Sequence, residues 1–269
     1  MANSKIYIGT TNIGSLFEGT SDVSIYLGAN KVYPLEVPLK FQATYIGGET
    51  YSAECDGNIT LSTIDTKPSG YEYSSMTDSI IGDCITAISD ASFDRCISLT
   101  SVTISSGVTY IGLDVFKGCS GLTSVAIPDN VTTIGSYAFS GCSSLTSITI
   151  PSGVTVIDVA LLQLCSSLTS VTLPSGVTSI NSVAFSNCSR LTSITLYDNV
   201  TDIGNYAFYG CTALRAVYIY NPIPPTLGSF AFYATNNCPI YVPSESVELY
   251  KSATNWNSYA SRIVSIPNN

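Results

Sequence analysis

The sequence contains no histidine, one tryptophan and two methionines, and only 11% of its 269 residues are charged. The absence of histidine removes the commonest general base and the commonest metal ligand of enzymes. Lys and Arg number 10 against 19 Asp and Glu, which gives a net charge of −9. Because an acidic chain without a basic cluster is poorly suited to phosphate groups, we expect neither nucleic acid nor an anionic membrane surface as a partner.

Long apolar runs are also missing. No run approaches the roughly 20 residues of a membrane span, so we expect no membrane insertion. The first residues lack the apolar core and the cleavage site of a secretory signal peptide. From the chain as given, we therefore expect the protein to stay in the compartment where it is made and its nine cysteines to be reduced.

Motifs of catalysis are scarce. The sequence has no Gly-rich phosphate loop and no nucleophile motif. Two carboxylates would suffice to hydrolyse a glycoside, but Asp129, Asp198 and Asp202 occupy turn or turn-adjacent positions, where Asp is favoured in any case. Their spacing is not that of a calcium site. We therefore predict no enzymatic activity, no catalytic residue, no cofactor and no metal site.

Six cysteines recur at a constant spacing of 23 residues. They are Cys96, Cys119, Cys142, Cys165, Cys188 and Cys211. Such single spacing is typical of a chain that stacks one small unit many times. Equivalent thiols would lie close enough for a disulfide, but this cysteine column shares its inward-facing stretch with Phe, and Cys is among the most buried residue types. We predict a buried, reduced column, with Cys55, Cys84 and Cys238 outside it.

Other apolar residues repeat with the same period. The columns are Leu99, Leu122, Leu145, Leu168, Leu191 and Leu214; Ile88, Ile111, Ile134, Ile157, Ile180 and Ile203; and Phe93, Phe116, Phe139, Phe185 and Phe208, with Leu162 in place of one Phe. Each unit predicts a short strand with apolar residues inward and Ser or Thr outward, then a turn, a shorter extended segment and a 3-10 or helical turn. One unit cannot cover its own apolar face, so neighbours must stack at about 4.8 Å per strand.

The repeated core Ala-Phe-x-x-Cys-x-x-Leu-Thr-Ser-Val-Thr-Ile-Pro closely resembles the BspA-like leucine-rich repeats of host-associated bacteria, over about residues 76–243. Known members are largely surface or secreted proteins implicated in adhesion, so the resemblance implies binding rather than catalysis. The stretch from Ile240 to Lys251 resembles the terminal cap of such proteins from gut Bacteroides. The Tyr-Ile-Gly and Tyr-Leu-Gly openings, with Cys55-Asp-Gly-Asn and Lys67-Pro-Ser-Gly-Tyr, resemble proteins of phages that infect gut Bacteroidales.

Together these features predict a β-rich α+β fold: a leucine-rich-repeat solenoid of about seven coils with a small N-terminal β domain and a helical C-terminal cap. The predicted parts are an N-terminal β arm that would anchor the chain (1–35), a small β meander (36–75), the solenoid (76–243) and the cap (244–269). Alternating residues around Gly47-Gly48 predict a hairpin in the meander. Ser244 is the expected N-cap of a helix in the cap.

The outward Ser and Thr columns are the candidate ligand surface. Thr is a good strand residue in any case, but a flat hydroxyl array also suits a glycan or a protein surface, or ordered water as in ice-binding solenoids. Near the C-terminal end, tyrosines replace the hydroxyls and offer large, rigid contact area. The candidate residues are Ser101, Thr103, Ser147, Thr149, Ser170, Thr172, Ser193, Thr195, Tyr218 and Tyr220.

One unit departs from the pattern, because it places Val159 and Leu164 where its neighbours have polar or small residues. The two alternatives are local repacking around Leu162, which we favour, and an exposed apolar contact spot.

The sequence thus predicts a non-enzymatic binding or display protein at a virion or cell surface. The preferred role is a phage virion component, in the tail, fibre or capsid, used in host recognition; the alternative is a bacterial cell-surface adhesin. The expected partner is a protein or glycan on a cell surface, with the N-terminal region docked to a larger assembly.

Overall fold

The computed structural model describes residues 26–27, 30–31, 39–45, 50–54, 60–61, 73–82 and 84–267. Most of the predicted arm at 1–35, and the Gly47-Gly48 turn, lie outside the described residues. Within the arm, β1 (Tyr26–Leu27) and β2 (Asn30–Lys31) pair antiparallel.

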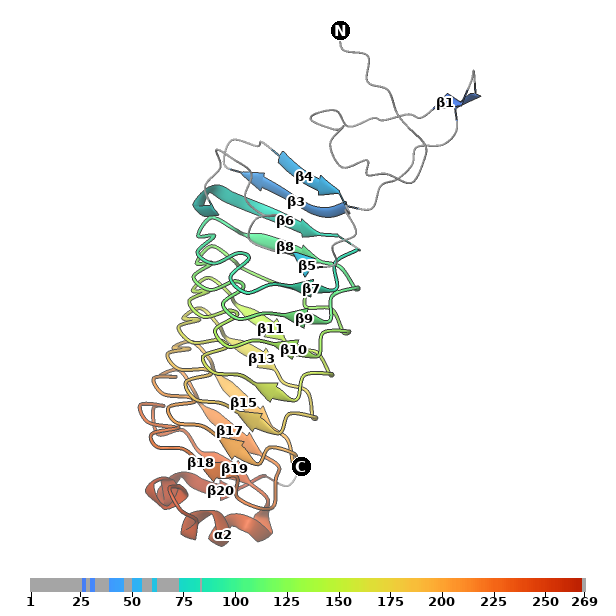
Figure 1. Cartoon of the computed structure of the whole chain (residues 1–269). Coiled ribbons are helices and arrows are strands. Elements are labelled where there is room, and N and C mark those ends of the chain that lie inside the picture. The colour runs from blue at the N-terminus through green and yellow to red at the C-terminus, as the bar shows by residue number, and fades with distance from the viewer. Residues whose placement is uncertain are drawn as a thin grey trace.

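The repeat units stack into an elongated solenoid (Figure 1), whose strands form two long, interrupted sheets on different sides of each coil. The longer strands make the first sheet. In spatial order they are β4 (Thr50–Glu54), β3 (Leu39–Tyr45), β6 (Met76–Ile81), β8 (Ser101–Ile104), β11 (Ser147–Thr149), β13 (Ser170–Thr172), β15 (Ser193–Leu196), β17 (Ala216–Ile219), β19 (Ile240–Val242) and β20 (Ile263–Ser265). A single bridge from Thr103 to Ala126 continues this sheet where one coil has no full strand.

The second sheet consists of two-residue strands. They are β5 (Thr60–Leu61), β7 (Ala87–Ile88), β9 (Tyr110–Ile111), β10 (Thr133–Ile134), β12 (Val156–Ile157), β14 (Ser179–Ile180), β16 (Asp202–Ile203) and β18 (Thr226–Leu227). Within each of two stretches, β7 to β10 and β12 to β18, neighbouring strands pair in parallel, as Ile180 does with Ile203. Because Ile203 pairs with Leu227, the last of these coils contains one extra residue.

The core is built from the repeat columns. The column leucines, phenylalanines and cysteines are fully buried, and the isoleucines nearly so. Phe93, Phe116 and Phe139 stack face to face with ring centroids 5.1 and 5.3 Å apart. Phe185, Phe208 and Phe232 form a second stack with the same spacing, and Leu162 lies between the two. The predicted solenoid is therefore confirmed, with about eight coils rather than seven, because β20 adds one more strand.

Of the described strands before residue 75, β3, β4 and β5 join the sheets of the solenoid. The predicted hairpin is confirmed, since β3 pairs antiparallel with β4 and places Ala43 opposite Tyr51. β3 also pairs antiparallel with β6, and β5 pairs in parallel with β7. A domain boundary near residue 75, where η1 (Tyr73–Ser75) precedes β6, stays a prediction.

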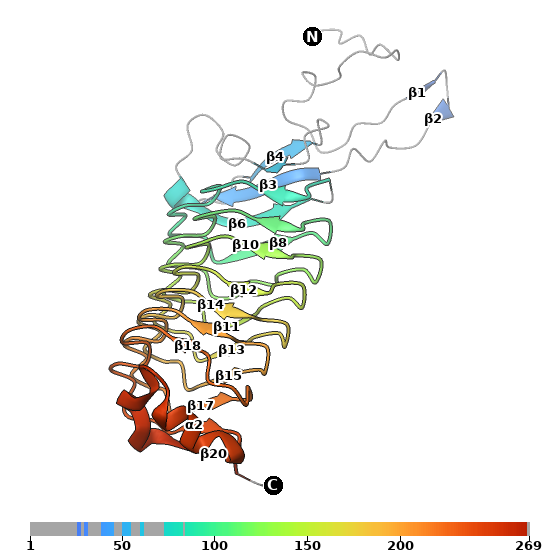
Figure 2. The same ribbon diagram turned by 60° about the horizontal axis from the view of Figure 1, so that its bottom comes forward.

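At the opposite end of the solenoid, η2 (Ser244–Ser246), α2 (Val247–Ser252), η3 (Trp256–Arg262) and β20 lie against the last coil (Figure 2). Trp256 is fully buried, contacts Phe232 at a ring separation of 6.0 Å, and donates its indole N–H to the Pro225 carbonyl at 2.7 Å. Helix is scarce here, because α2 has only six residues. The predicted N-cap is wrong: Ser246, not Ser244, precedes α2, and it makes no side-chain capping bond.

Each column thiol from Cys119 to Cys211 donates a hydrogen bond to a carbonyl of the coil before it. The bonds are Cys119 to Phe93 (3.1 Å), Cys142 to Phe116 (3.1 Å), Cys165 to Phe139 (3.2 Å), Cys188 to Leu162 (3.1 Å) and Cys211 to Phe185 (3.2 Å). Cysteine suits this position because its side chain is small, is readily buried and carries a weak hydrogen-bond donor. The predicted buried and reduced column is confirmed, because all six thiols are free.

The expectation that every cysteine is reduced is wrong, since Cys84 is disulfide-bonded. Cys84 precedes the column and does not share its period, so the repeat gave no information about its neighbours.

The buried thiols predict a loss of stability at alkaline pH. Burial raises the pKa of Cys165 to about 12 and that of Cys142 well above its usual value. Unfolded thiols ionise from about pH 8.5, whereas the folded chain keeps these protons, so the free energy of unfolding falls as pH rises from about 9 towards 12. In urea unfolding experiments across this range, the free energy of unfolding of Cys165→Ala should fall less steeply with pH than that of the wild type. The difference in slope should correspond to up to about one proton. An unchanged slope in that variant would contradict this assignment.

Candidate functional site

The Ser and Thr candidates on the first sheet lie on its outer face. Ser147 stands beside Ser170, and Thr149 beside Thr172, in the parallel pairing of β11 with β13. Ser101, Thr103 and Ser193 are exposed like these four, and Thr195 is half-buried. The structure thus brings residues that are 23 apart in the sequence into two exposed columns.

Hydroxyl groups in this sheet have two different roles. In the column just before the strands, each threonine hydroxyl donates to the carbonyl of the equivalent threonine one coil earlier, as Thr169 does to Thr146 at 3.0 Å. Ser101 donates to the Asp78 carboxylate at 2.6 Å. In contrast, the side chains of the candidates from Ser147 to Thr195 make no hydrogen bond with any other residue that the structure describes. Their hydroxyls are therefore available to a ligand.

The tyrosine candidates extend this face unevenly. Tyr218 pairs with Thr195 and stacks on Tyr241 with ring centroids 4.9 Å apart, which leaves it half-buried. Tyr220 lies one residue beyond β17, stacks on Tyr197 at 6.3 Å, and is exposed. The two tyrosines therefore belong to two neighbouring stacks rather than to one surface column.

The irregular unit is only partly explained by repacking. Leu161 and Leu162 are fully buried where neighbouring coils have Ala and Phe, as repacking predicts. Leu164, however, is 50% exposed and has a φ of +62°, in the left-handed region. The favoured repacking is therefore wrong for Leu164: its backbone directs the side chain outward, in a column that holds Gly in neighbouring coils such as Gly141.

Four aromatic side chains on the turn side of the last coils were not predicted as a site. Tyr206 stacks on Phe230 at 5.3 Å, and Tyr209 stacks on Tyr233 at 6.0 Å. Edge-to-face contacts of 5.7 Å join the two pairs. Phe230 and Tyr233 are 51% and 55% exposed. We call Tyr206, Tyr209, Phe230 and Tyr233 the aromatic quartet. The two residues of each stacked pair are 24 residues apart, so the quartet does not follow the 23-residue period of the repeat.

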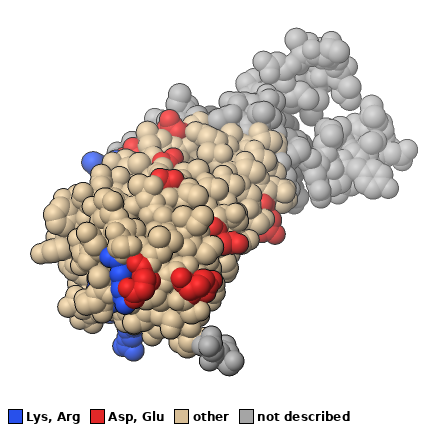
Figure 3. Space-filling model, turned by 90° about the horizontal axis from the view of Figure 1, so that it is seen from below, with Lys and Arg blue, Asp and Glu red and all other residues tan. Residues whose placement is uncertain are grey.

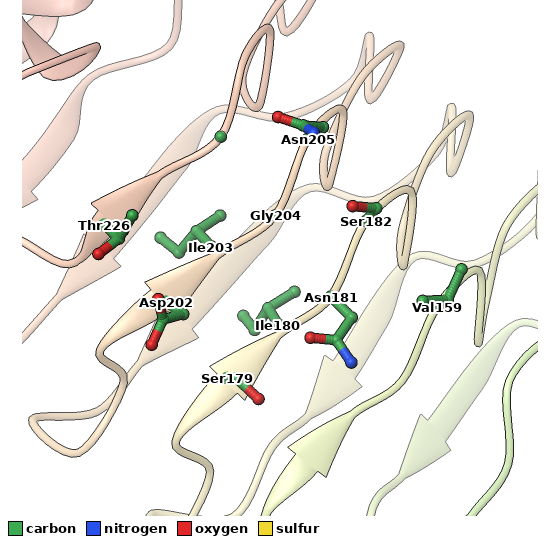
Figure 4. Close-up of a pocket in the computed structure, with 11 residues that line it drawn as sticks. Val159, Ser179, Ile180, Asn181, Ser182, Asp202, Ile203, Gly204, Asn205 and Thr226 are labelled. Carbon is green, nitrogen blue, oxygen red and sulfur yellow. The ribbon is translucent and has the colours of Figure 1, made fainter.

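A groove of about 480 Å³, lined by polar side chains and also by Val159, Ile180 and Ile203, crosses four coils on the outer side of the second sheet. In Figure 4, Ser179, Asp202 and Thr226 form a row on β14, β16 and β18, and Asn181, Ser182 and Asn205 lie further along the coils. Gly204 and Gly228 leave two of the coil corners without side chains. We call this the polar groove. The sequence placed Asp202 near a turn but gave it no role.

Charged side chains are sparse. On the face seen in Figure 3, a few small clusters of acidic and basic groups lie on a largely uncharged surface. Among the residues that the structure describes, no three His, Cys, Asp or Glu side chains gather as a metal site would require. Within the same residues, no helix has the length and apolarity to cross a bilayer.

The fold and its repeated columns define the class of protein: a leucine-rich-repeat solenoid. The family described as "BspA type Leucine rich repeat region" matches residues 65–190 and 157–269, in six copies. The chain belongs to this family. A comparison with curated proteins gives no match.

Solved structures of leucine-rich-repeat proteins are similar to the chain. A leucine rich cell surface protein from Faecalibacterium prausnitzii is 34% identical, with a TM-score of 0.54, over 66% of this chain and 45% of that chain. A leucine-rich-repeat protein of T. pallidum is 20% identical, with a TM-score of 0.39, over 78% and 80% of the two chains. One from Bacteroides ovatus is 22% identical, with a TM-score of 0.28, over 78% and 71%. The chain thus spans less than half the length of the Faecalibacterium protein.

Proposed function

We propose that the chain is a non-enzymatic binding protein displayed outside a bacterial cell, and that the outer face of its first sheet contacts a protein or glycan on another cell. The observation that carries the proposal is the pair of exposed columns on β11, β13 and β15, whose hydroxyls are not bonded to other described residues. A rigid array of such groups, held by a buried core, binds a partner at little cost in conformational entropy.

Two observations support display outside the cell. The similar Faecalibacterium protein is described as a cell surface protein. Disulfides persist mainly in oxidising compartments, and Cys84 is disulfide-bonded. The virion role and the docking of the N-terminal region, predicted from the sequence, stay predictions.

Binding without turnover can be measured directly. The purified chain is applied to immobilised mucin and to intact epithelial cells, and the retained protein is quantified while the mucin glycans are analysed by mass spectrometry. We expect saturable retention and chemically unchanged glycans. Either the absence of retention on both surfaces or cleavage of the glycans would refute the proposal.

A further inference from the structure

Residues of the polar groove and of the aromatic quartet are neighbours in the sequence. Asn205 lines the groove, and the next residue is Tyr206; Gly228 lines it, and Phe230 follows two residues later. We propose that together they form one binding site for a neutral oligosaccharide, separate from the outer face of the first sheet.

The exposed, stacked rings support a ligand role for the aromatic residues. Tyr206 and Phe230 have φ values of +56° and +57°, a left-handed conformation that is unfavourable for bulky residues and is relieved by Gly or Asn. The equivalent residues of earlier coils, such as Tyr137 and Val183, have the same conformation, so it belongs to the repeat and is not particular to this site. Tyr206 and Phe230 differ from those residues in that their rings stack on each other and are exposed. Exposed rings at such positions are well suited to contact the apolar face of a sugar.

The groove supplies the hydrogen-bonding groups that sugar hydroxyls need. One carboxylate oxygen of Asp202 accepts from Thr201 at 2.9 Å, and the other makes no bond with a described residue. The side-chain amide nitrogen of Asn181 donates to Asp158 at 3.2 Å, and its amide oxygen can accept a hydrogen bond from a ligand. The hydroxyls of Ser179 and Thr226 act as both donor and acceptor. A mixed set of donors and acceptors beside aromatic rings matches a ligand whose groups are all hydroxyls.

Charge and spacing narrow the ligand class. The groove contains the Asp202 carboxylate and no Lys or Arg, and the chain carries a net charge of −9, so a sulfated or carboxylated glycan would be repelled. The groove repeats its polar groups once per coil, at about 4.8 Å. Successive sugars of an extended chain advance by a similar distance, so neighbouring sugars would meet one polar side chain of the row Ser179, Asp202 and Thr226 on each coil.

Affinity electrophoresis tests the proposal with four neutral polysaccharides in the gel: xyloglucan, mixed-linkage β-glucan, galactomannan and pullulan. The variants are Asp202→Ala and the pair Tyr206→Asn with Phe230→Asn. Because Asn tolerates a positive φ, the aromatic variant should keep its fold, which circular dichroism and thermal melting check. Tyr137→Asn is the matched control, since Tyr137 has a φ of +60° in the same column but lies away from the groove.

We expect at least one polysaccharide to retard the wild type and Tyr137→Asn, and at least ten-fold weaker binding for the groove and aromatic variants. A second control, Thr149→Lys with Thr172→Lys on the first sheet, should be retarded like the wild type, which separates this site from the proposed function. The proposal is overturned if none of the four retards the wild type, or if both site variants are retarded as strongly as the wild type.

Discussion

Leu161→Ala should destabilise the solenoid by about 2–5 kcal/mol, because it opens a cavity in a fully buried coil. Leu162→Phe alone should cost about 1–3 kcal/mol through overpacking beside Leu161. The double variant restores the Ala-Phe pair of the neighbouring coils, as in Ala138-Phe139, and joins the two Phe stacks. It should therefore lie within about 1.5 kcal/mol of the wild type, as volume-conserving exchanges do.

Urea unfolding followed by circular dichroism checks this cycle. Coupled sites give a double variant that is more stable than the sum of the single effects predicts. Additive losses would show that Leu161 and Leu162 do not share one space in the core, and that the irregular coil is packed in some other way.

Gly135→Ala is the second variant with a large expected effect. A Cβ at Gly135 would lie 2.7 Å from both the carbonyl carbon and the oxygen of Gly112, and neither backbone atom can move cheaply. We expect a loss of about 1–3 kcal/mol or more. In the coils that carry Asp158 and Asn181 instead, the side chains bond each other at 3.2 Å, a compensation that alanine lacks.

Gly176→Ala is the matched control, because its Cβ would meet only the Ser152 carbonyl oxygen, at 3.8 Å. Its unfolding midpoint should stay near that of the wild type. If Gly135→Ala unfolded at the same urea concentration as Gly176→Ala, the close approach of coils at this corner would be disproved.

Much of this architecture follows from the sequence, because a strict period fixes which residues are equivalent. Once Cys142 and Cys165 are aligned, the inward and outward positions of every strand between them follow from side-chain alternation. The buried column and the exposed candidates Ser147 and Ser170 were predictable for this reason.

The remainder was hidden where the period changes or where a residue lies outside it. The extra residue before Leu227 shifts Phe230 to 24 residues after Tyr206, so the aromatic quartet does not appear in a frame of 23. Cys84 precedes the column, and its disulfide depends on three-dimensional proximity alone. The exposure of Leu164 follows from a positive φ, which the residue type argues against.

The outer face of the first sheet is the proposed binding surface. It is tested most directly by comparing retention on immobilised mucin for the wild type, Thr149→Lys with Thr172→Lys, and Ser152→Lys with Ser175→Lys. The last pair adds the same charge at exposed turn positions outside the strands. We predict at least ten-fold weaker retention for the first variant alone. Equal retention of all three proteins would contradict the account.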